Sequence, residues 1–189
     1  MDMYTASDLK KGLSIKLDNE PHVITEFNFV KPGKGQALYR SKLKNMITGA
    51  QFERTFRSVD TFEQADLRER KMQYLYKEEG KYCFMDNENY EQVFMTEDQV
   101  GEAKNYLIDN LDVQILFFEE NPLGINLPNF IDLVVVKAEP WARGDSVSGK
   151  TKPVILQTGY QIQVPPFVEE GEKIRVDTRS GEYLTRVKG

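Results

Sequence analysis

The stretch Lys31-Pro32-Gly33-Lys34-Gly35-Gln36 holds the residue types best suited to a chemical role. Proline fixes its own φ, and the two glycines that flank Lys34 carry no side chains. We therefore expect Lys34 at the narrow, exposed tip of a hairpin. A long cation on such a tip can enter a crowded anionic site, where bulkier neighbours would clash. An ordinary solvent-facing turn is the alternative interpretation.

The residues needed for most catalytic or metal centres are scarce. The chain has one cysteine, Cys83, and one histidine, His22, which exclude an internal disulfide and a Cys/His zinc site. With a single cysteine and a single histidine, the chain also has few residues from which a nucleophilic triad could be built. We expect His22 to be structural and Cys83 to be a small residue of a buried or half-buried strand. The sequence thus predicts no catalytic residue, no metal and no cofactor, and the protein is not expected to be an enzyme.

A second motif, Gly144-Asp145-Ser146-Val147-Ser148-Gly149-Lys150-Thr151, matches the pattern of a phosphate-binding loop. That loop needs a helix directly after it, so that the helix N-terminus faces the phosphates. Here Pro153 follows two residues after Thr151, and the next residues favour a strand. We interpret the segment as a hairpin loop that contacts nucleic acid through Arg143, Lys150 and Lys152, and not as a site for nucleotide hydrolysis.

Charge is distributed unevenly along the 189 residues, although the net charge is only −5. Residues 1–65 hold 10 basic and 8 acidic residues, residues 66–129 hold 6 and 14, and residues 130–189 hold 9 and 8. Residues 31–57 alone carry seven cations against the single carboxylate Glu53. A basic first third beside an acidic middle favours one part that meets phosphates and one that faces away from them. A solvated strand face is the alternative.

The apolar pattern is mostly that of short strands separated by turn residues, which predicts an all-β protein. Blocks of about 60 residues suggest three small barrels, with domains at 1–65, 66–129 and 130–189. One helix is expected after the capping box of Thr96 and Gln99, with helical spacing as far as Leu111. No run approaches the ~20 apolar residues of a membrane span, and no secretory signal is evident, so we expect a cytoplasmic monomer.

Three stretches resemble the bacterial elongation factor P family, in the expected order and over essentially the whole chain. Residues 30–37 resemble the modification loop of the family, residues 152–172 its C-terminal signature, and residues 177–183 with Arg186 its closing segment. A paralogous family lacks the lysine at the loop tip, and Lys34 argues against that assignment.

This resemblance implies three small β-barrel domains in an L shape like that of transfer RNA. The first would be an SH3-like (KOW) barrel and the other two OB-folds, with one short helix in the middle domain. It also implies a factor that binds the ribosome between the P and E sites and stimulates peptide-bond formation, relieving stalling at consecutive prolines. The family is similar to initiation factor five A, and Lys34 would receive β-lysine from a lysyl-tRNA-synthetase-like enzyme.

The predicted contacts lie in the first and last thirds of the chain. They are with P-site peptidyl-tRNA, with ribosomal RNA and with the mRNA at the E site. The predicted RNA-binding residues are Arg40, Lys42, Lys44, Arg143, Gly144, Asp145, Lys150, Tyr183 and Arg186. Because Tyr183 and Arg186 are three residues apart, either a bulge brings both to RNA or one of them is structural. Of the two, Arg186 is the favoured RNA contact. The alternative function is a generic OB-fold protein that binds single-stranded nucleic acid, which would require basic grooves that the acidic middle third disfavours.

Overall fold

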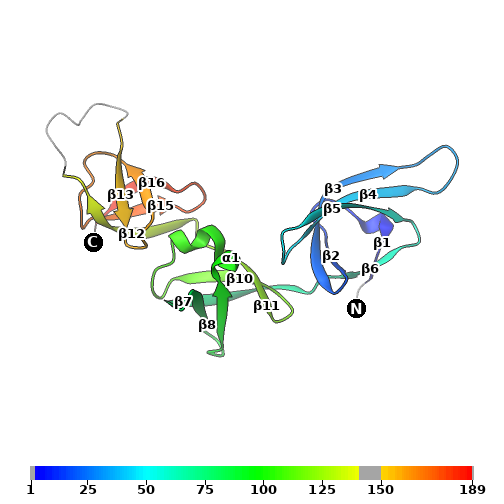
Figure 1. Cartoon of the computed structure of the whole chain (residues 1–189), viewed down its shortest axis with the longest axis horizontal. Helices are drawn as coiled ribbons and strands as arrows, with labels where there is room; N and C mark the ends of the chain where they lie inside the picture. Colours follow the sequence, from blue (N-terminus) through cyan, green and yellow to red (C-terminus); the bar gives the residue numbers. More distant parts are fainter. Residues whose placement is uncertain (1–2, 141–149, 189) are drawn as a thin grey trace. The chain divides into compact units, whose positions relative to one another are not determined.

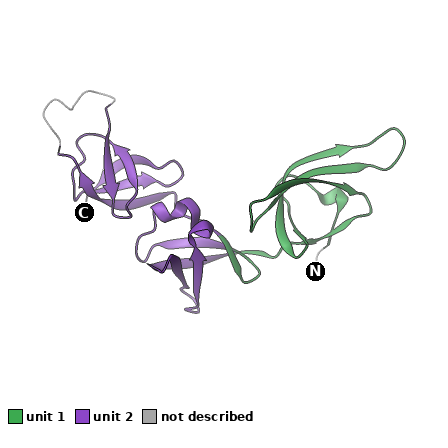
Figure 2. Ribbon diagram, viewed as in Figure 1, with its two compact units in different colours: residues 1–68, 117–123 green, residues 69–116, 124–189 purple. Residues whose placement is uncertain are grey.

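The computed structural model describes residues 3–140 and 150–188. Regular structure in these ranges is almost entirely β, arranged in three sheets, which confirms the predicted class (Figure 1). The chain divides into two compact units, residues 1–68 with 117–123 and residues 69–116 with 124–189 (Figure 2). We call these unit 1 and unit 2. None of the helices in the described ranges has the length and apolar character needed to cross a membrane.

The first sheet has six strands in the order β1-β6-β2-β3-β4-β5. Their bounds are Met3–Thr5 (β1), Ser14–Leu17 (β2), Glu20–Val30 (β3), Leu38–Asn45 (β4), Gln51–Arg57 (β5) and Thr61–Gln64 (β6), and a 3-10 segment, η1, spans Ala6–Asp8. Asp18 and Asn19 both take positive φ and join β2 to β3 in a two-residue turn. The β3–β4 hairpin is antiparallel, and its last pair is Val30 with Leu38.

Alternation along β4 separates the core of the first sheet from its outer face. Leu43 is buried, whereas its neighbours Lys42 and Lys44 are exposed. The buried apolar residues of this sheet are Ala6, Leu9, Ile15, Ile24, Leu43, Phe56 and Phe62. His22 is also buried, with its ring edge-on to Phe52 at 5.5 Å, as expected of a structural histidine.

The second sheet has the order β11-β10-β7-β8-β9. Its strands are Leu67–Glu78 (β7), Lys81–Asp86 (β8), Gln92–Thr96 (β9), Asp112–Phe118 (β10) and Asn121–Asn126 (β11). Glu79 and Gly80, both at positive φ, close the predicted β7–β8 hairpin. Cys83 is fully buried in β8. Tyr90 directly follows the turn after β8, at φ 63°, and its N–H donates to the Asp86 carbonyl.

The helix is shorter than the sequence predicts. Thr96 and Gln99 form the expected capping box at the start of α1, which spans Glu97–Val100. The expected continuation to Leu111 is wrong, because Gly101 takes φ 60° and ends the α-helical hydrogen bonding. The chain continues as a 3-10 segment, η2, over Gly101–Asn105. Apolar spacing alone did not reveal the break that glycine allows.

The third sheet has the order β14-β13-β12-β15-β16. Its strands are Phe130–Ala138 (β12), Lys152–Leu156 (β13), Gln161–Val164 (β14), Lys173–Asp177 (β15) and Glu182–Val187 (β16). β14 lies beside β16, so the sheet curls on itself. The buried residues of its core are Ile131, Leu133, Val135, Val154, Leu156, Ile162, Val164, Val168, Ile174 and Val176, joined by Tyr106 from outside the sheet.

Candidate nucleic-acid interface

The loop between β3 and β4 presents Lys34 at its midpoint. Residues 31–36 are all exposed, and the flanking pair Val30 and Leu38 closes the hairpin below them. Gly35 takes φ 111°, a conformation that other residues rarely adopt. A side chain at Gly33 would meet nothing within 4 Å, so the free space there serves access to the tip rather than packing. The predicted exposed lysine at a narrow tip is therefore present.

Three predicted RNA-binding residues share the outer face of β4. Arg40, Lys42 and Lys44 are exposed and alternate with the buried Ser41 and Leu43. The sequence prediction of a cationic outward row on this strand is thus correct in geometry. The row belongs to the same hairpin as Lys34, so these side chains and the loop form one continuous part of unit 1.

Carboxylates from the neighbouring strands interrupt this row. The register pairs Lys42 with Glu26 of β3 and with Glu53 of β5. The Lys42 ammonium lies 2.8 Å from a Glu26 carboxylate oxygen. The hydrogen bond and the opposite charge raise the pKa of Lys42 and lower the pKa of Glu26. The sequence count missed Glu26 because it lies outside residues 31–57, and only the strand register brings it to Lys42.

Arg40 has a different environment on the same face. Its cross-strand partners are Asn28 and Thr55, which are uncharged. A shallow hollow of ≈ 470 Å³ is lined by Arg40, Lys42 and their cross-strand neighbours. Within it, Arg40 offers a planar donor group beside neutral hydrogen-bonding side chains, an arrangement that suits bidentate contact with a phosphate.

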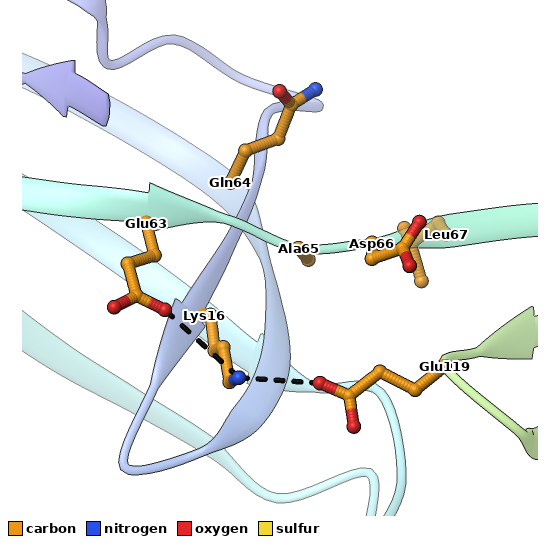
Figure 3. Close-up of a pocket in the computed structure, with 7 residues that line it drawn as sticks. All are labelled: Lys16, Glu63, Gln64, Ala65, Asp66, Leu67 and Glu119. Atoms are coloured by element: carbon orange, nitrogen blue, oxygen red, sulfur yellow. Dashed lines mark hydrogen bonds and ion pairs between the residues drawn. The ribbon is translucent and has the colours of Figure 1, made fainter. Parts of the chain in front are cut away.

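A second hollow in unit 1 is occupied by an ion-pair cluster (Figure 3). The Lys16 ammonium of β2 lies 3.2 Å from Glu119 and 3.9 Å from Glu63. The Glu119 N–H also donates to the Asp66 carbonyl, so the turn between β10 and β11 is held at two points. Lys16 and Glu119 are 103 positions apart, so sequence reasoning had no local signal for this pair. The Lys16 ammonium is already paired with two carboxylates, which favours a structural role.

A bulge near the end of the chain brings the predicted pair Tyr183 and Arg186 to one hollow. The pairing of β15 with β16 passes from Arg175–Thr185 to Val176–Tyr183 and leaves Leu184 as the extra residue. Tyr183 and Arg186 both line a hollow of ≈ 750 Å³. The Arg186 guanidinium lies 4.7 Å from the centre of the Phe167 ring and 3.5 Å from a Glu172 oxygen. The bulge that joint RNA contact requires is present. Tyr183 also packs against the core of the third sheet, so it has a structural role besides.

The remaining predicted residues surround the segment before β13. Arg143, Gly144 and Asp145 lie outside the described residues. Lys150 is exposed, whereas the Lys152 ammonium donates to the Glu139 carbonyl at 2.6 Å. Strand β13 begins directly after Thr151, so a strand stands where a phosphate-binding loop would need a helix.

The described site residues thus belong to both units. Lys34, Arg40, Lys42 and Lys44 lie in unit 1, and Lys150, Tyr183 and Arg186 lie in unit 2. Among the described residues, no group of three His, Cys, Asp or Glu side chains could hold a metal ion.

Family models match three consecutive segments of the chain. Residues 5–62 match the KOW-like domain of elongation factor P, residues 67–125 its OB domain and residues 123–186 its C-terminal domain. A solved structure of eukaryotic translation initiation factor 5A from Methanococcus jannaschii covers 67% of this chain and 94% of its own, at TM-score 0.57 and 20% identity. A KOW-like domain followed by OB domains, with a lysine-tipped hairpin, defines a class of translation factor.

Curated relatives narrow the class. Elongation factor P of Syntrophus aciditrophicus is 76% identical over 187 residues, which cover 99% of this chain and 100% of that protein. Elongation factor P 2 of Geobacter sulfurreducens is 60% identical over the same shares of the two chains. The chain belongs to the elongation factor P family.

Proposed function

We propose that this factor binds the ribosome between the P and E sites and stimulates peptide-bond formation where consecutive prolines stall the nascent chain. Lys34, extended by β-lysylation, would lie near the acceptor end of the P-site tRNA. Proline is a poor attacking group because its amine is secondary and its geometry is restricted. An elongated cation that orders the two reactants accelerates the reaction by an entropic route and requires no nucleophile from the protein.

One observation carries this proposal, namely the exposed loop with Lys34 at its midpoint between Gly33 and Gly35. Its small flanking residues suit entry into a crowded RNA site and also access by a lysyl-tRNA-synthetase-like enzyme. Arg40 and Lys44, on the outer face below the loop, would bind phosphates of tRNA or ribosomal RNA. Lys42 would contribute less, because Glu26 already pairs with it.

The last third of the chain would make the second set of contacts. Lys150, Tyr183 and Arg186 would contact RNA, and Arg143, Gly144 and Asp145 would lie toward the mRNA at the E site. This assignment follows the proposed division into domains at 1–65, 66–129 and 130–189, with the acidic middle domain turned partly away from RNA. The factor would act as a cytoplasmic monomer.

Substitutions at Lys34 test the proposal. We expect Lys34→Ala to fold normally, within about 0.5 kcal/mol of the parent, because an exposed loop-tip side chain has few packing contacts. It should abolish relief of stalling on messages that encode consecutive prolines in a reconstituted translation assay. Lys34→Arg keeps the charge but lacks the acceptor amine, so it should also fail.

Lys31→Ala is the matched control, because it removes a cation from the same loop and should retain most of the activity. Peptide mapping of protein purified from its native cell should find added mass on the peptide that contains Lys34. Full activity of Lys34→Ala would remove this residue from the mechanism. A generic single-stranded nucleic-acid binder would instead show affinity for RNA oligonucleotides that does not depend on Lys34.

A further inference from the structure

Tyr106 is buried in the core of the third sheet, although it lies outside that sheet. It follows η2, directly after the helix of the middle third of the chain, and belongs to the same buried cluster as Leu133, Val154 and Ile174. Ile108 and Leu111, which follow it closely in sequence, pack against this cluster as well. Only 5% of the surface of Tyr106 is exposed. Both parts of this cluster lie in unit 2.

Tyr160, in the turn between β13 and β14, is the neighbour of Tyr106. The two rings meet edge to face with centroids 5.6 Å apart, and the nearby Tyr160 hydroxyl contributes, after burial, to the raised pKa of Tyr106. The same turn makes another contact with η2, since the Thr158 hydroxyl donates to the Asn105 carbonyl at 2.7 Å. Residues 105–106 and 158–160 are therefore joined by one hydrogen bond and one ring contact.

The two hydroxyls lie against the backbone of a third segment, the turn that leads into β16. Gly181 takes φ 77° there, and its N–H donates to the Asp177 carbonyl at 2.7 Å. A Cβ on Gly181 would lie 3.1 Å from the Tyr106 hydroxyl oxygen and 3.4 Å from that of Tyr160. The first of these contacts is tighter than ordinary packing allows. The two hydroxyl oxygens therefore lie close against this turn and leave little room for a side chain at Gly181.

β16 begins at Glu182, one residue after this turn, and carries both Tyr183 and Arg186. A displacement of Gly181 would move the start of the strand and the bulge at Leu184 that follows. The bulge is what directs Tyr183 and Arg186 to the same hollow.

We propose that Tyr106 and Tyr160 are positioning residues, whose hydroxyls pack against the Gly181 turn and thereby orient Tyr183 and Arg186 for RNA contact. The part that concerns RNA rests on the function proposed above. Removing the Tyr106 hydroxyl leaves both rings in the core but opens space next to the turn. The effect should therefore be local loosening of the turn with the sheet intact.

Amide hydrogen exchange of the free protein tests the positioning directly. In Tyr106→Phe, amides of residues 181–183 should exchange about threefold to tenfold faster, because the turn loses the oxygen packed against it and opens more easily. Amides in the middle of β12 should keep their parental rates. Tyr74→Phe is the matched control, because Tyr74 is similarly buried, at 6% exposure, in a different part of unit 2. It should leave residues 181–183 unchanged.

A substitution at Gly181 gives an independent check. Gly181→Ala should loosen the turn by steric conflict, and adding Tyr106→Phe should recover part of the loss because the oxygen nearest the new methyl group is gone. Unchanged exchange at residues 181–183 in Tyr106→Phe would overturn the positioning role. Equal loss in the Tyr74→Phe control would also overturn it.

Ribosome binding separates this inference from the function on which it rests. Tyr106→Phe should weaken binding about threefold to tenfold, matching the change in exchange. Arg186→Glu should weaken it more, because it reverses a contacting charge. If Arg186→Glu binds like the parent, the proposed RNA contact fails, and the exchange data on the free protein still decide the positioning. If Arg186→Glu weakens binding and Tyr106→Phe does not, the orienting role is wrong.

Discussion

Asp86 is buried although it carries a charge. Its side chain is 8% exposed and accepts a hydrogen bond from the Glu88 N–H at 2.8 Å. Arg70 donates two more, through Nη2 at 2.6 Å and Nε at 3.2 Å. The same residue closes the 86–91 turn through its backbone N–H and carbonyl. One carboxylate thus organises the connection between β8 and β9.

We predict that Asp86→Asn lowers the free energy of unfolding by about 2–4 kcal/mol, because the half-buried Arg70 loses its shortest charged contact and keeps the longer one with Glu91 at 3.4 Å. Urea unfolding at neutral pH measures this loss. Asp112→Asn is the control, since Asp112 forms an exposed pair with Lys71 at 3.8 Å and should cost less than about 1 kcal/mol. Equal costs for the two variants would contradict the assigned role of burial.

Acidic pH should reduce the stability that the Asp86 carboxylate provides. The Glu88 N–H and the Arg70 guanidinium hold the pKa of Asp86 below its ordinary 3.8. The stabilisation is therefore complete above that ordinary value and is lost as the pH falls through the lowered pKa. Asp86→Asn should lack this component of acid sensitivity.

On the outer face of β3, β4 and β5, strand pairing determines how strongly each cation can attract a phosphate. Lys42 lies between Glu26 and Glu53, whereas Arg40 lies between Asn28 and Thr55. A phosphate that approaches this face therefore gains more from Arg40 than from Lys42. A count of cations along one strand treats the two as equal.

We predict that Arg40→Gln reduces the salt dependence of ribosome binding by a slope of about one, whereas Lys42→Gln changes it by much less. Glu26→Gln should release Lys42 and strengthen binding. Affinity measured over a series of salt concentrations tests all three variants. Equal slopes for Arg40→Gln and Lys42→Gln would show that the Glu26 pair does not shield Lys42 in solution.

The elements also show what local sequence signals can and cannot predict. The Lys34 hairpin and the Glu79-Gly80 turn were predictable because proline and glycine mark them directly. The early end of α1 was not, since Val100, Leu107 and Leu111 keep helical spacing through the break at Gly101. The bulge at Leu184 could be stated only as a condition, because register depends on the partner strand.

Contacts between residues far apart in the sequence could not be predicted, for the same reason. Lys16 and Glu119, or Tyr106 and Gly181, meet only once strands far apart in the chain have packed. The lysine at the loop tip could therefore be predicted, but not the carboxylate that shields Lys42 or the support beneath β16.

For the molecule as a whole, the first and third sheets have separate cores. The core of the first sheet uses residues between Ala6 and Phe62, and that of the third sheet uses residues after Phe130 together with Tyr106. Burial, with Tyr160 and the nearby carboxylates Glu102 and Asp177, raises the pKa of Tyr106 to about 12. Burial likewise raises the pKa values of Tyr74 and Tyr183, which also belong to unit 2.

Alkaline pH should therefore weaken unit 2. In the unfolded chain these tyrosines ionise near 10, before they do so in the folded state, so their contribution is complete below pH 10. It is lost as the pH rises through each raised pKa, which for Tyr106 is about 12. Calorimetry between pH 9 and about 11.5 should show the melting temperature of unit 2 falling, with a smaller fall in Tyr106→Phe. An identical pH profile in that variant would contradict the assignment to Tyr106.

The crowding at Gly181 limits which residues can replace this glycine in homologous proteins. Two separate constraints exclude a side chain there: the positive φ, and the Tyr106 and Tyr160 oxygens 3.1 and 3.4 Å from any Cβ. Replacing Tyr106 by phenylalanine removes the nearer oxygen but not the φ, which asparagine tolerates better than most residues. Across homologous sequences, positions 106, 160 and 181 should thus vary together. Asparagine at 181 should occur only where a tyrosine hydroxyl has been lost.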